Sequence, residues 1–144
     1  MTSSQTATPS KWASRWPLLA PLLAVGVVVW AVFPRHVPEA GTLVGRWVRE
    51  EGGYVLEVKT AGNDGRAEVA YLNPERSKPI HVARSSVTRE DALKLFIELR
   101  DEGYPGSTYT LAFDPEDGRL KGEYFQAQEG SRSAVSFTRA TPRP

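Results

Sequence analysis

The chain has 144 residues, carries 18 lysines and arginines against 17 aspartates and glutamates, and contains no cysteine. Its length accommodates one domain of ordinary size and a short additional segment. The balanced charge argues against a nucleic-acid partner, which usually requires a strongly basic face. The lack of cysteine excludes disulfides, thiolate metal sites, a cysteine nucleophile and a lipid-modified cysteine.

The first 34 residues differ in composition from the rest of the chain. Residues 1–15 are rich in serine, threonine and alanine, which predicts a disordered cytoplasmic tail. From Trp16 to Phe33 there are 18 residues without a charge. As a helix this run would extend roughly 27 Å, close to the hydrocarbon thickness of about 30 Å. We therefore expect a transmembrane anchor over residues 16–34, with the lipid bilayer as its partner.

Two alternatives exist for the apolar run, a buried core helix and a cleaved signal peptide. A buried helix would find nothing to pack against beside a chain that is otherwise β-patterned. A signal peptide remains open, since Val29 and Ala31 give a small-residue cleavage pattern. Lys11 and Arg15 precede the run, so the positive-inside rule predicts a cytoplasmic N-terminus. Residues 35–144 would then lie across the membrane, in the periplasm of a Gram-negative host.

The rest of the chain alternates apolar and polar side chains in short segments separated by turn residues. The pattern is clearest between Leu93 and Leu99, where every second residue is apolar. A strand places alternate side chains on opposite faces, so this segment has one buried and one wet face. The segments predicted as strands are 42–49, 54–60, 66–72, 80–88, 92–100, 107–113, 119–127 and 133–139.

The connections between these segments are short, which favours antiparallel neighbours in sequence order. Closing such a meander into a barrel removes the two edges that an open sheet must defend. After a linker at 35–41 we therefore expect an all-β domain over residues 42–139, followed by a loose tail at 140–144. The expected architecture is an eight-stranded antiparallel up-and-down barrel, with a β-sandwich as the alternative that periodicity does not separate from it.

Alternate positions of the predicted strands define the interior of this barrel. An eight-stranded barrel is just wide enough to be filled by side chains or to hold one small ligand. The inward residues are large for so small a domain, which favours a mostly filled interior. They are Leu43, Trp47, Leu56, Val58, Val69, Tyr71, Leu93, Leu95, Ile97, Leu99, Tyr109, Leu111, Phe113, Leu120, Tyr124, Val135 and Phe137.

A few expected inward positions carry a polar group, namely Tyr71, Tyr109, Tyr124 and Gln126. A buried polar group needs a partner. These side chains therefore either converge on a ligand at one open end of the barrel or bond one another within the core. Tyr104 lies in a predicted turn, where it is either an exposed interface anchor or a ring folded back over the barrel mouth.

Gly45-x-Trp47, in the first of eight predicted strands, resembles the first strand of the calycin barrels, the lipocalins and avidins. In those families the tryptophan closes one barrel end and the glycine makes room for its ring. The resemblance implies a small-ligand-binding barrel, with the loop at 73–79 in the position of the avidin lid. No tryptophan follows Trp47, so an avidin-like biotin site is not expected, and the further lipocalin motifs are absent from the sequence.

No catalytic or metal-binding constellation stands out. His36 and His81 give no metal-ligand spacing, and no nucleophile elbow or phosphate loop is found. We therefore expect no enzyme, no cofactor and no metal, but a membrane-anchored extracytoplasmic module that binds a small apolar or amphipathic ligand or an envelope protein. The alternative is a ligand-free structural or accessory subunit of a membrane complex. The candidate ligand-binding residues are Trp47, Tyr71, Tyr104, Tyr109, Tyr124 and Gln126.

Overall fold

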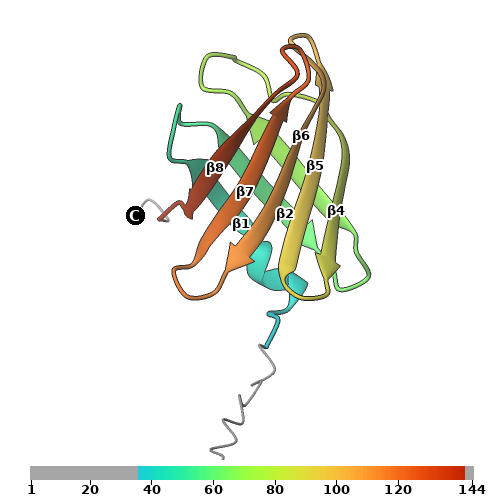
Figure 1. Cartoon of the computed structure of the whole chain (residues 1–144), viewed down its shortest axis with the longest axis vertical. Coiled ribbons are helices and arrows are strands. Elements are labelled where there is room, and N and C mark those ends of the chain that lie inside the picture. Colours follow the sequence, from blue (N-terminus) through green and yellow to red (C-terminus); the bar gives the residue numbers. More distant parts are fainter. Residues whose placement is uncertain (1–35, 142–144) are drawn as a thin grey trace, which may run out of the picture. The chain divides into compact units, whose positions relative to one another are not determined.

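The computed structural model describes residues 36–141, which contain one short turn of 3-10 helix, η1 (Ala40–Leu43), followed by eight strands (Figure 1). The strands are β1 (Gly45–Arg49), β2 (Val55–Ala61), β3 (Ala67–Leu72), β4 (Val82–Arg89), β5 (Leu93–Asp101), β6 (Tyr104–Asp114), β7 (Arg119–Gln126) and β8 (Ser131–Arg139). The predicted tail at 1–15 and anchor at 16–34 lie outside the described residues. In residues 36–141, no helix has the length and apolar character needed to cross a membrane.

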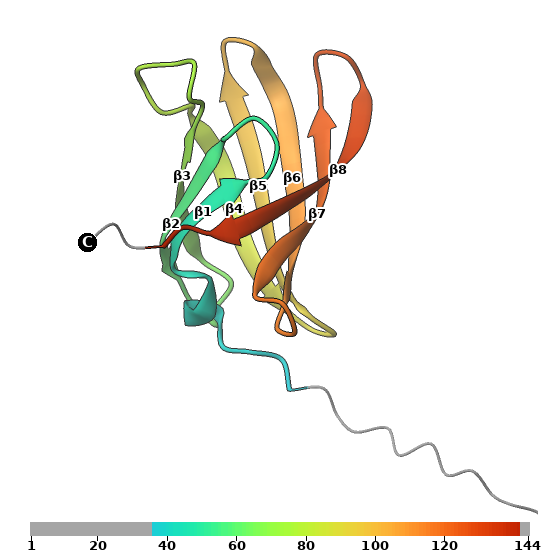
Figure 2. The same ribbon diagram turned by 90° about the vertical axis from the view of Figure 1, so that its left-hand side faces the viewer.

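The eight strands form one antiparallel sheet in the order β3-β2-β1-β8-β7-β6-β5-β4. The first and last strands meet, with Trp47 opposite Arg139 and Arg49 opposite Phe137. Since all eight strands belong to one sheet that curves into a nearly closed barrel, the prediction of an all-β antiparallel barrel is confirmed and the sandwich alternative is wrong. Figure 2 shows η1 at one end of the barrel and the β1–β2, β3–β4, β5–β6 and β7–β8 connections at the other.

The barrel is not fully closed, because β3 and β4 lack a continuous ladder between them. The seam is held by the Ile80 amide donating to the Tyr71 carbonyl at 2.9 Å and the Ser85 hydroxyl donating to the Ala67 carbonyl at 2.7 Å. The longest connection of the barrel joins these two strands and contains Pro74 and Pro79. Proline has no amide hydrogen to donate to a ladder, so pairing is interrupted at this connection.

The strand boundaries differ from the predicted ones at two informative places. Residues 42–44 precede β1 rather than beginning it, because the chain first forms η1, in which Ala40 and Leu43 are fully buried. The predicted linker therefore ends before Ala40. Strand β6 begins at Tyr104, three residues earlier than predicted, and Tyr104 pairs with Asp101 across a tight turn.

Large side chains fill the barrel interior. All the predicted inward residues are buried except Phe113, Tyr124 and Gln126, which are half-buried, and the rings of Phe113 and Tyr124 pack against the core. The sequence analysis missed Ile80 and Val87, which point inward from the weakly patterned segment around β4. The core also contains the aromatic rings of Trp47, Tyr71, Tyr109 and Phe137, each with almost no exposed surface.

The barrel end next to η1 is sealed around Trp47. The indole Nε1 donates to the Leu43 carbonyl at 2.9 Å, and Phe113 meets the ring edge-on at a centroid distance of 6.1 Å. The guanidinium of Arg139 lies over the indole, 4.1 Å from its centroid. A cation over an aromatic face is attracted by the negative face of the ring.

Gly45, the glycine of the Gly-x-Trp motif, leaves space for the side chain of Arg139. Gly45 has a φ of +136°, and a Cβ atom placed there would lie 2.6 Å from Nη1 of Arg139. The guanidinium occupies the free space and donates to the main-chain carbonyls of Val44 at 2.8 Å and Thr42 at 2.5 Å. The expectation that the glycine makes room for the Trp47 ring is therefore corrected: it makes room for the arginine that covers the ring.

Candidate functional site

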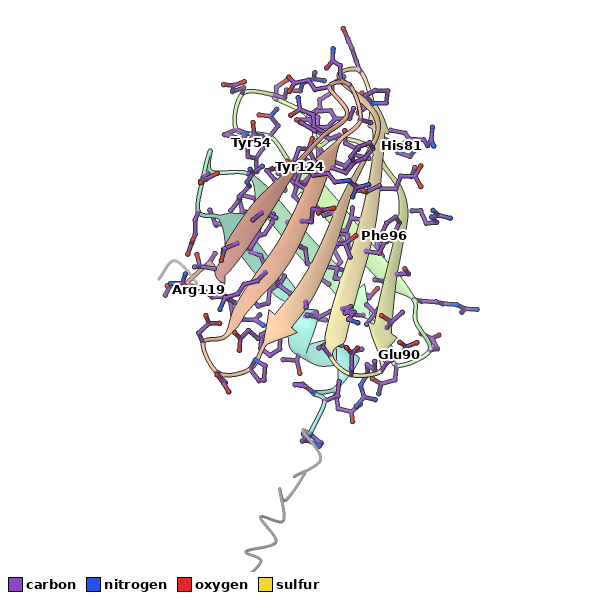
Figure 3. All side chains as sticks on the ribbon, viewed as in Figure 1. Tyr54, His81, Glu90, Phe96, Arg119 and Tyr124 are labelled. Carbon is purple, nitrogen blue, oxygen red and sulfur yellow. The ribbon has the colours of Figure 1, made fainter. Side chains whose placement is uncertain are left out.

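The opposite end of the barrel, which we call the mouth, contains all five tyrosines of the chain. In an up-and-down barrel alternate connections lie at the same end, so residues near the β1–β2, β3–β4, β5–β6 and β7–β8 connections meet there (Figure 2). Tyr54 and Tyr124 are visible at this end in Figure 3. We define the tyrosine cluster as Tyr54, Tyr71, Tyr104, Tyr109 and Tyr124.

Tyr71 of β3 lies at the centre of the tyrosine cluster. Its ring stacks on Tyr54 at 6.0 Å, meets Tyr104 edge-on at 6.1 Å and contacts Tyr109 at 5.5 Å. Tyr109 in turn stacks on Tyr124 at 4.5 Å. These distances and tilts are those at which aromatic pairs attract beyond simple burial. The cluster therefore forms a continuous aromatic layer between the filled interior and the solvent.

The hydroxyls of Tyr71, Tyr104 and Tyr109 form hydrogen bonds and remain protonated. The hydroxyl oxygens of Tyr71 and Tyr109 lie 2.9 Å apart, and the Asn73 side-chain amide donates to the Tyr104 hydroxyl at 2.9 Å. Burial raises the pKa of Tyr109 to about 12, and it also raises the pKa values of Tyr71 and Tyr104. At neutral pH these phenols are therefore uncharged.

Arg49 of β1 brings a positive charge into the tyrosine cluster. Its side chain is only 12% exposed, and its guanidinium carbon lies 5.5 Å from the Tyr54 ring and 5.6 Å from the Tyr124 ring. Nη1 donates a long hydrogen bond of 3.4 Å to the Tyr109 hydroxyl. Nη2 is 3.8 Å from the carboxylate of Glu51, which is itself 83% exposed. Nε is buried and has no hydrogen-bond partner among the described residues.

An open pocket of about 470 Å³ lies over this layer. Its lining surface is mostly polar and combines four tyrosine rings with charged, amide and hydroxyl groups from five strands or their connections. The lining residues with side chains are Arg49, Glu51, Tyr54, Tyr71, Arg76, Tyr104, Tyr124, Gln126, Gln128 and Ser133. Arg76 comes from the β3–β4 connection and lies over the Tyr104 ring at 5.6 Å.

A second hollow, of about 430 Å³, lies at the sealed end beside the first described residues. Of its three acidic side chains, Asp91 and Asp114 accept hydrogen bonds from Lys94 at 2.6 Å and from Lys121 at 2.9 Å, and Glu116 is the third. The members of these two hydrogen-bonded pairs already satisfy one another on the surface. The mouth, where buried donors meet aromatic faces, is therefore the better candidate for a binding site.

The structure brings most of the predicted site residues together. Tyr71, Tyr104, Tyr124 and Gln126 line the pocket, and Tyr109 lies directly beneath it. Trp47 is not among them, because it lies in the sealed end against Phe113 and Arg139. Of the two predicted positions for Tyr104, the folded-back ring is the one observed, since this residue is buried.

Three residues that line the pocket were not predicted as site residues, namely Arg49, Tyr54 and Arg76. Arg49 follows Trp47 by two residues and Tyr54 precedes Leu56 by two, so strand alternation places both on the inner face. That signal was present in the sequence, although a charged residue at an inward position was not expected. Arg76 lies in an irregular connection, where no periodicity indicates its direction.

Within residues 36–141 no group of three potential metal-ligating side chains is found. No protein-family model, curated protein or solved structure matches the chain. The nearly closed eight-stranded barrel is compatible with a calycin-like fold, and the resemblance extends no further than the barrel and the Gly45-x-Trp47 strand.

Proposed function

We propose that this protein is a binding module that holds one small apolar or amphipathic molecule at the tyrosine-lined mouth of its barrel. The observation that carries the proposal is the pocket of about 470 Å³ above the tyrosine cluster. Small-molecule sites typically have about 300–1,000 Å³ and combine apolar or aromatic walls with a few placed polar groups. Four phenol rings, Arg49 and Gln126 supply both kinds of contact here.

The packing of the interior limits the size of such a ligand. Tyr71 and Tyr109 have almost no exposed surface and form the floor of the pocket, above a core of leucines, Ile97 and Phe137. A bound molecule would therefore lie in the mouth rather than deep inside the barrel. We propose a small, preferably flat ligand that covers the aromatic layer.

We further propose that the barrel is calycin-like and is tethered to a membrane, displayed outside the cytoplasm. The support is in the sequence: an uncharged run of 18 residues from Trp16 to Phe33, preceded by Lys11 and Arg15. A phosphatase reporter that requires export, fused after Pro144, should be active in cells. Activity of a reporter that folds only in the cytoplasm would contradict this topology.

The second candidate function is that of a ligand-free accessory subunit in a membrane complex. The observation in its favour is the filled interior, since Trp47, Tyr71, Tyr109 and Phe137 have almost no exposed surface. In that case an envelope protein, rather than a small molecule, would cover the tyrosine-lined mouth. The two candidates differ in what occupies the same surface.

Mass spectrometry of the intact protein, purified from its native membranes, distinguishes these functions. Ser133 lies on the exposed edge of the pocket, so Ser133→Trp should obstruct the mouth without disturbing the core. Thr110→Trp, on the exposed outer face of β6, is the matched control. We expect a small molecule to co-purify with the wild type and the control but not with Ser133→Trp. Co-purification of a protein alone, lost in Ser133→Trp, would favour the accessory function instead.

A further inference from the structure

The mouth contains an incompletely paired hydrogen-bond donor, the guanidinium of Arg49. A guanidinium carries five N–H donors and no acceptor. The described residues offer this one a single long hydrogen bond of 3.4 Å, to Tyr109, and a loose ion pair of 3.8 Å with the exposed Glu51. Its Nε is buried and has no hydrogen-bond partner among the described residues, whereas buried donors are normally satisfied, so this guanidinium can still donate to an acceptor that enters the pocket.

The tyrosine hydroxyls add further donors at the mouth. The Tyr109 oxygen accepts from Arg49, and the bond between Tyr71 and Tyr109 uses only one of their two hydroxyl hydrogens. One O–H therefore remains to be donated, whichever way that bond is directed. The Tyr104 oxygen accepts from Asn73, so its own hydrogen is also left for another acceptor.

The charge of the mouth sets the charge of its ligand. The pocket lining contains two cations, Arg49 and Arg76, and one anion, Glu51, which leaves a net charge of +1. A singly charged anion neutralises this charge, whereas a doubly charged phosphate would leave an excess negative charge in a partly desolvated site. The planar fork of a guanidinium also matches a carboxylate, which it can bind through two parallel hydrogen bonds.

We propose that the ligand is a small organic carboxylate whose carboxylate group is bound by Arg49, with a hydroxyl of the tyrosine cluster as an additional donor. Its apolar body would lie on the rings of Tyr54 and Tyr124, which flank the guanidinium. This inference rests on the proposed function, because it names the class of molecule that the mouth would hold. On this inference Arg49 recognises the ligand and contributes little to the stability of the barrel.

Fluorine NMR of the full-length protein with 4-fluorobenzoate and its neutral counterpart 4-fluorobenzamide tests this directly. Hydrogen bonds to charged groups are strong enough that we expect the benzoate to bind about tenfold or more tightly than the amide. Octanoate and octanamide, measured by competition, provide the same comparison for an alkyl body. Ser133→Trp should abolish the binding of all four compounds.

Arg49→Gln should remove the preference for the carboxylate, and Arg49→Lys, which keeps the charge but not the fork, should reduce it. The control is Arg84→Gln, which removes an arginine that lies over the Phe96 ring at 5.4 Å on the outer face and should keep the preference. Near-ultraviolet circular dichroism of the tyrosines verifies that each variant is folded.

The outcomes separate this inference from the proposed function. Equal binding of acid and amide at the mouth, or a preference unchanged in both Arg49 variants, would overturn the carboxylate inference and leave the proposed binding function in place. Failure of all four compounds to bind the wild type, or binding unaffected by Ser133→Trp, would overturn both.

Discussion

The two ends of the barrel each place an arginine against aromatic rings, with different results. At the sealed end Arg139 lies 4.1 Å from the Trp47 ring and donates to two main-chain carbonyls. At the mouth the Arg49 guanidinium lies 5.5 Å from the Tyr54 ring and 5.6 Å from the Tyr124 ring, and it donates one long hydrogen bond, to Tyr109. The same pairing of cation and ring therefore completes a structural seal in one place and, in the other, leaves donors that the described residues do not pair.

The difference arises from what the neighbouring backbone offers. The chain enters the barrel through η1, and the carbonyl oxygens of Thr42 and of Val44 directly after η1 accept from Arg139, which occupies the space that Gly45 leaves. The mouth offers rings and hydroxyl groups, of which the Tyr71–Tyr109 pair is already hydrogen-bonded. An aromatic face attracts a guanidinium but does not satisfy its individual N–H groups.

The largest expected effect is at the sealed end. Trp47→Ala should lower the free energy of unfolding by about 3–5 kcal/mol, as large aromatic truncations in a core do. Urea denaturation of the full chain measures it, with Val44→Ala, at a residue that is 41% exposed, as the control. A loss below about 1 kcal/mol would show that the ring does not support the barrel.

At the mouth, the raised pKa of Tyr109 predicts a loss of stability in alkali. Tyrosine in an unfolded chain ionises at about pH 10, whereas the folded protein holds Tyr109 protonated up to about 12. Between these values the unfolded state binds fewer protons, so the free energy of unfolding falls as pH rises, by roughly 3 kcal/mol for this group. Denaturation between pH 9 and pH 12 measures the slope, which should be smaller in Tyr109→Phe. An equal slope in both proteins would show that Tyr109 is not buried in the folded state.

Replacing each arginine by glutamine compares the two ends most closely. Arg139→Gln loses two hydrogen bonds from a charged group to carbonyls, so we expect the free energy of unfolding to fall by about 1–3 kcal/mol. Among the described residues, Arg49→Gln loses one long hydrogen bond and a loose ion pair with Glu51, and it removes a buried Nε that has no partner there, so its cost should be under about 1 kcal/mol. The reverse order of the two losses in thermal unfolding would mean that the mouth arginine is the structural one.

The smallest effect concerns the β3–β4 connection beside the mouth. The carboxylate of Asp101 accepts from the amide of His81 at 2.8 Å, and this bond, with a second from Glu102, lowers the pKa of Asp101. The ionised carboxylate of Asp101 therefore stabilises the connection at pH values above about 4, the pKa of an aspartate in an unfolded chain. This stabilisation is lost as the pH falls through the lower pKa that Asp101 has in the folded protein.

Amide hydrogen exchange at His81 measures the hydrogen bond between the His81 amide and the Asp101 carboxylate. Asp101→Asn should accelerate exchange at His81, and acid below about pH 4 should have the same effect on the wild type after correction for the intrinsic rate. Asp64→Asn, in the turn at the sealed end, is the control and should leave His81 unchanged. Identical exchange in the two variants would show that Asp101 does not hold the connection.

Strand alternation explains how much of the fold was predictable. From Leu93 to Leu99 and from Tyr109 to Leu111 the period of two set the inner face correctly, since one buried face fixes the register of a strand. It could not indicate η1, because a single turn has too few residues to show a period. It also could not indicate the open seam, which depends on the pairing of β3 and β4 across a long connection.

The site was predictable in part for the same reason. Tyr71, Tyr109 and Tyr124 were expected on the inner face, but which end of the barrel they occupy depends on strand stagger, which the sequence does not reveal. The same alternation places Trp47 on the inner face and so predicts it as a site residue, although it lies at the other end of the barrel. Arg49 lies on the same face of its strand, and only the structure reveals that its guanidinium is weakly paired, with an Nε that has no hydrogen-bond partner among the described residues.

The most direct test of the contrast between the two ends is an experimental structure of the full-length protein with 4-fluorobenzoate. The account predicts that the carboxylate oxygens lie about 3 Å from nitrogens of Arg49, over Tyr54 and Tyr124, while Arg139 keeps its hydrogen bonds to Val44 and Thr42. A structure at saturating ligand in which the mouth is empty, and Arg49 is fully paired with protein groups, would contradict it.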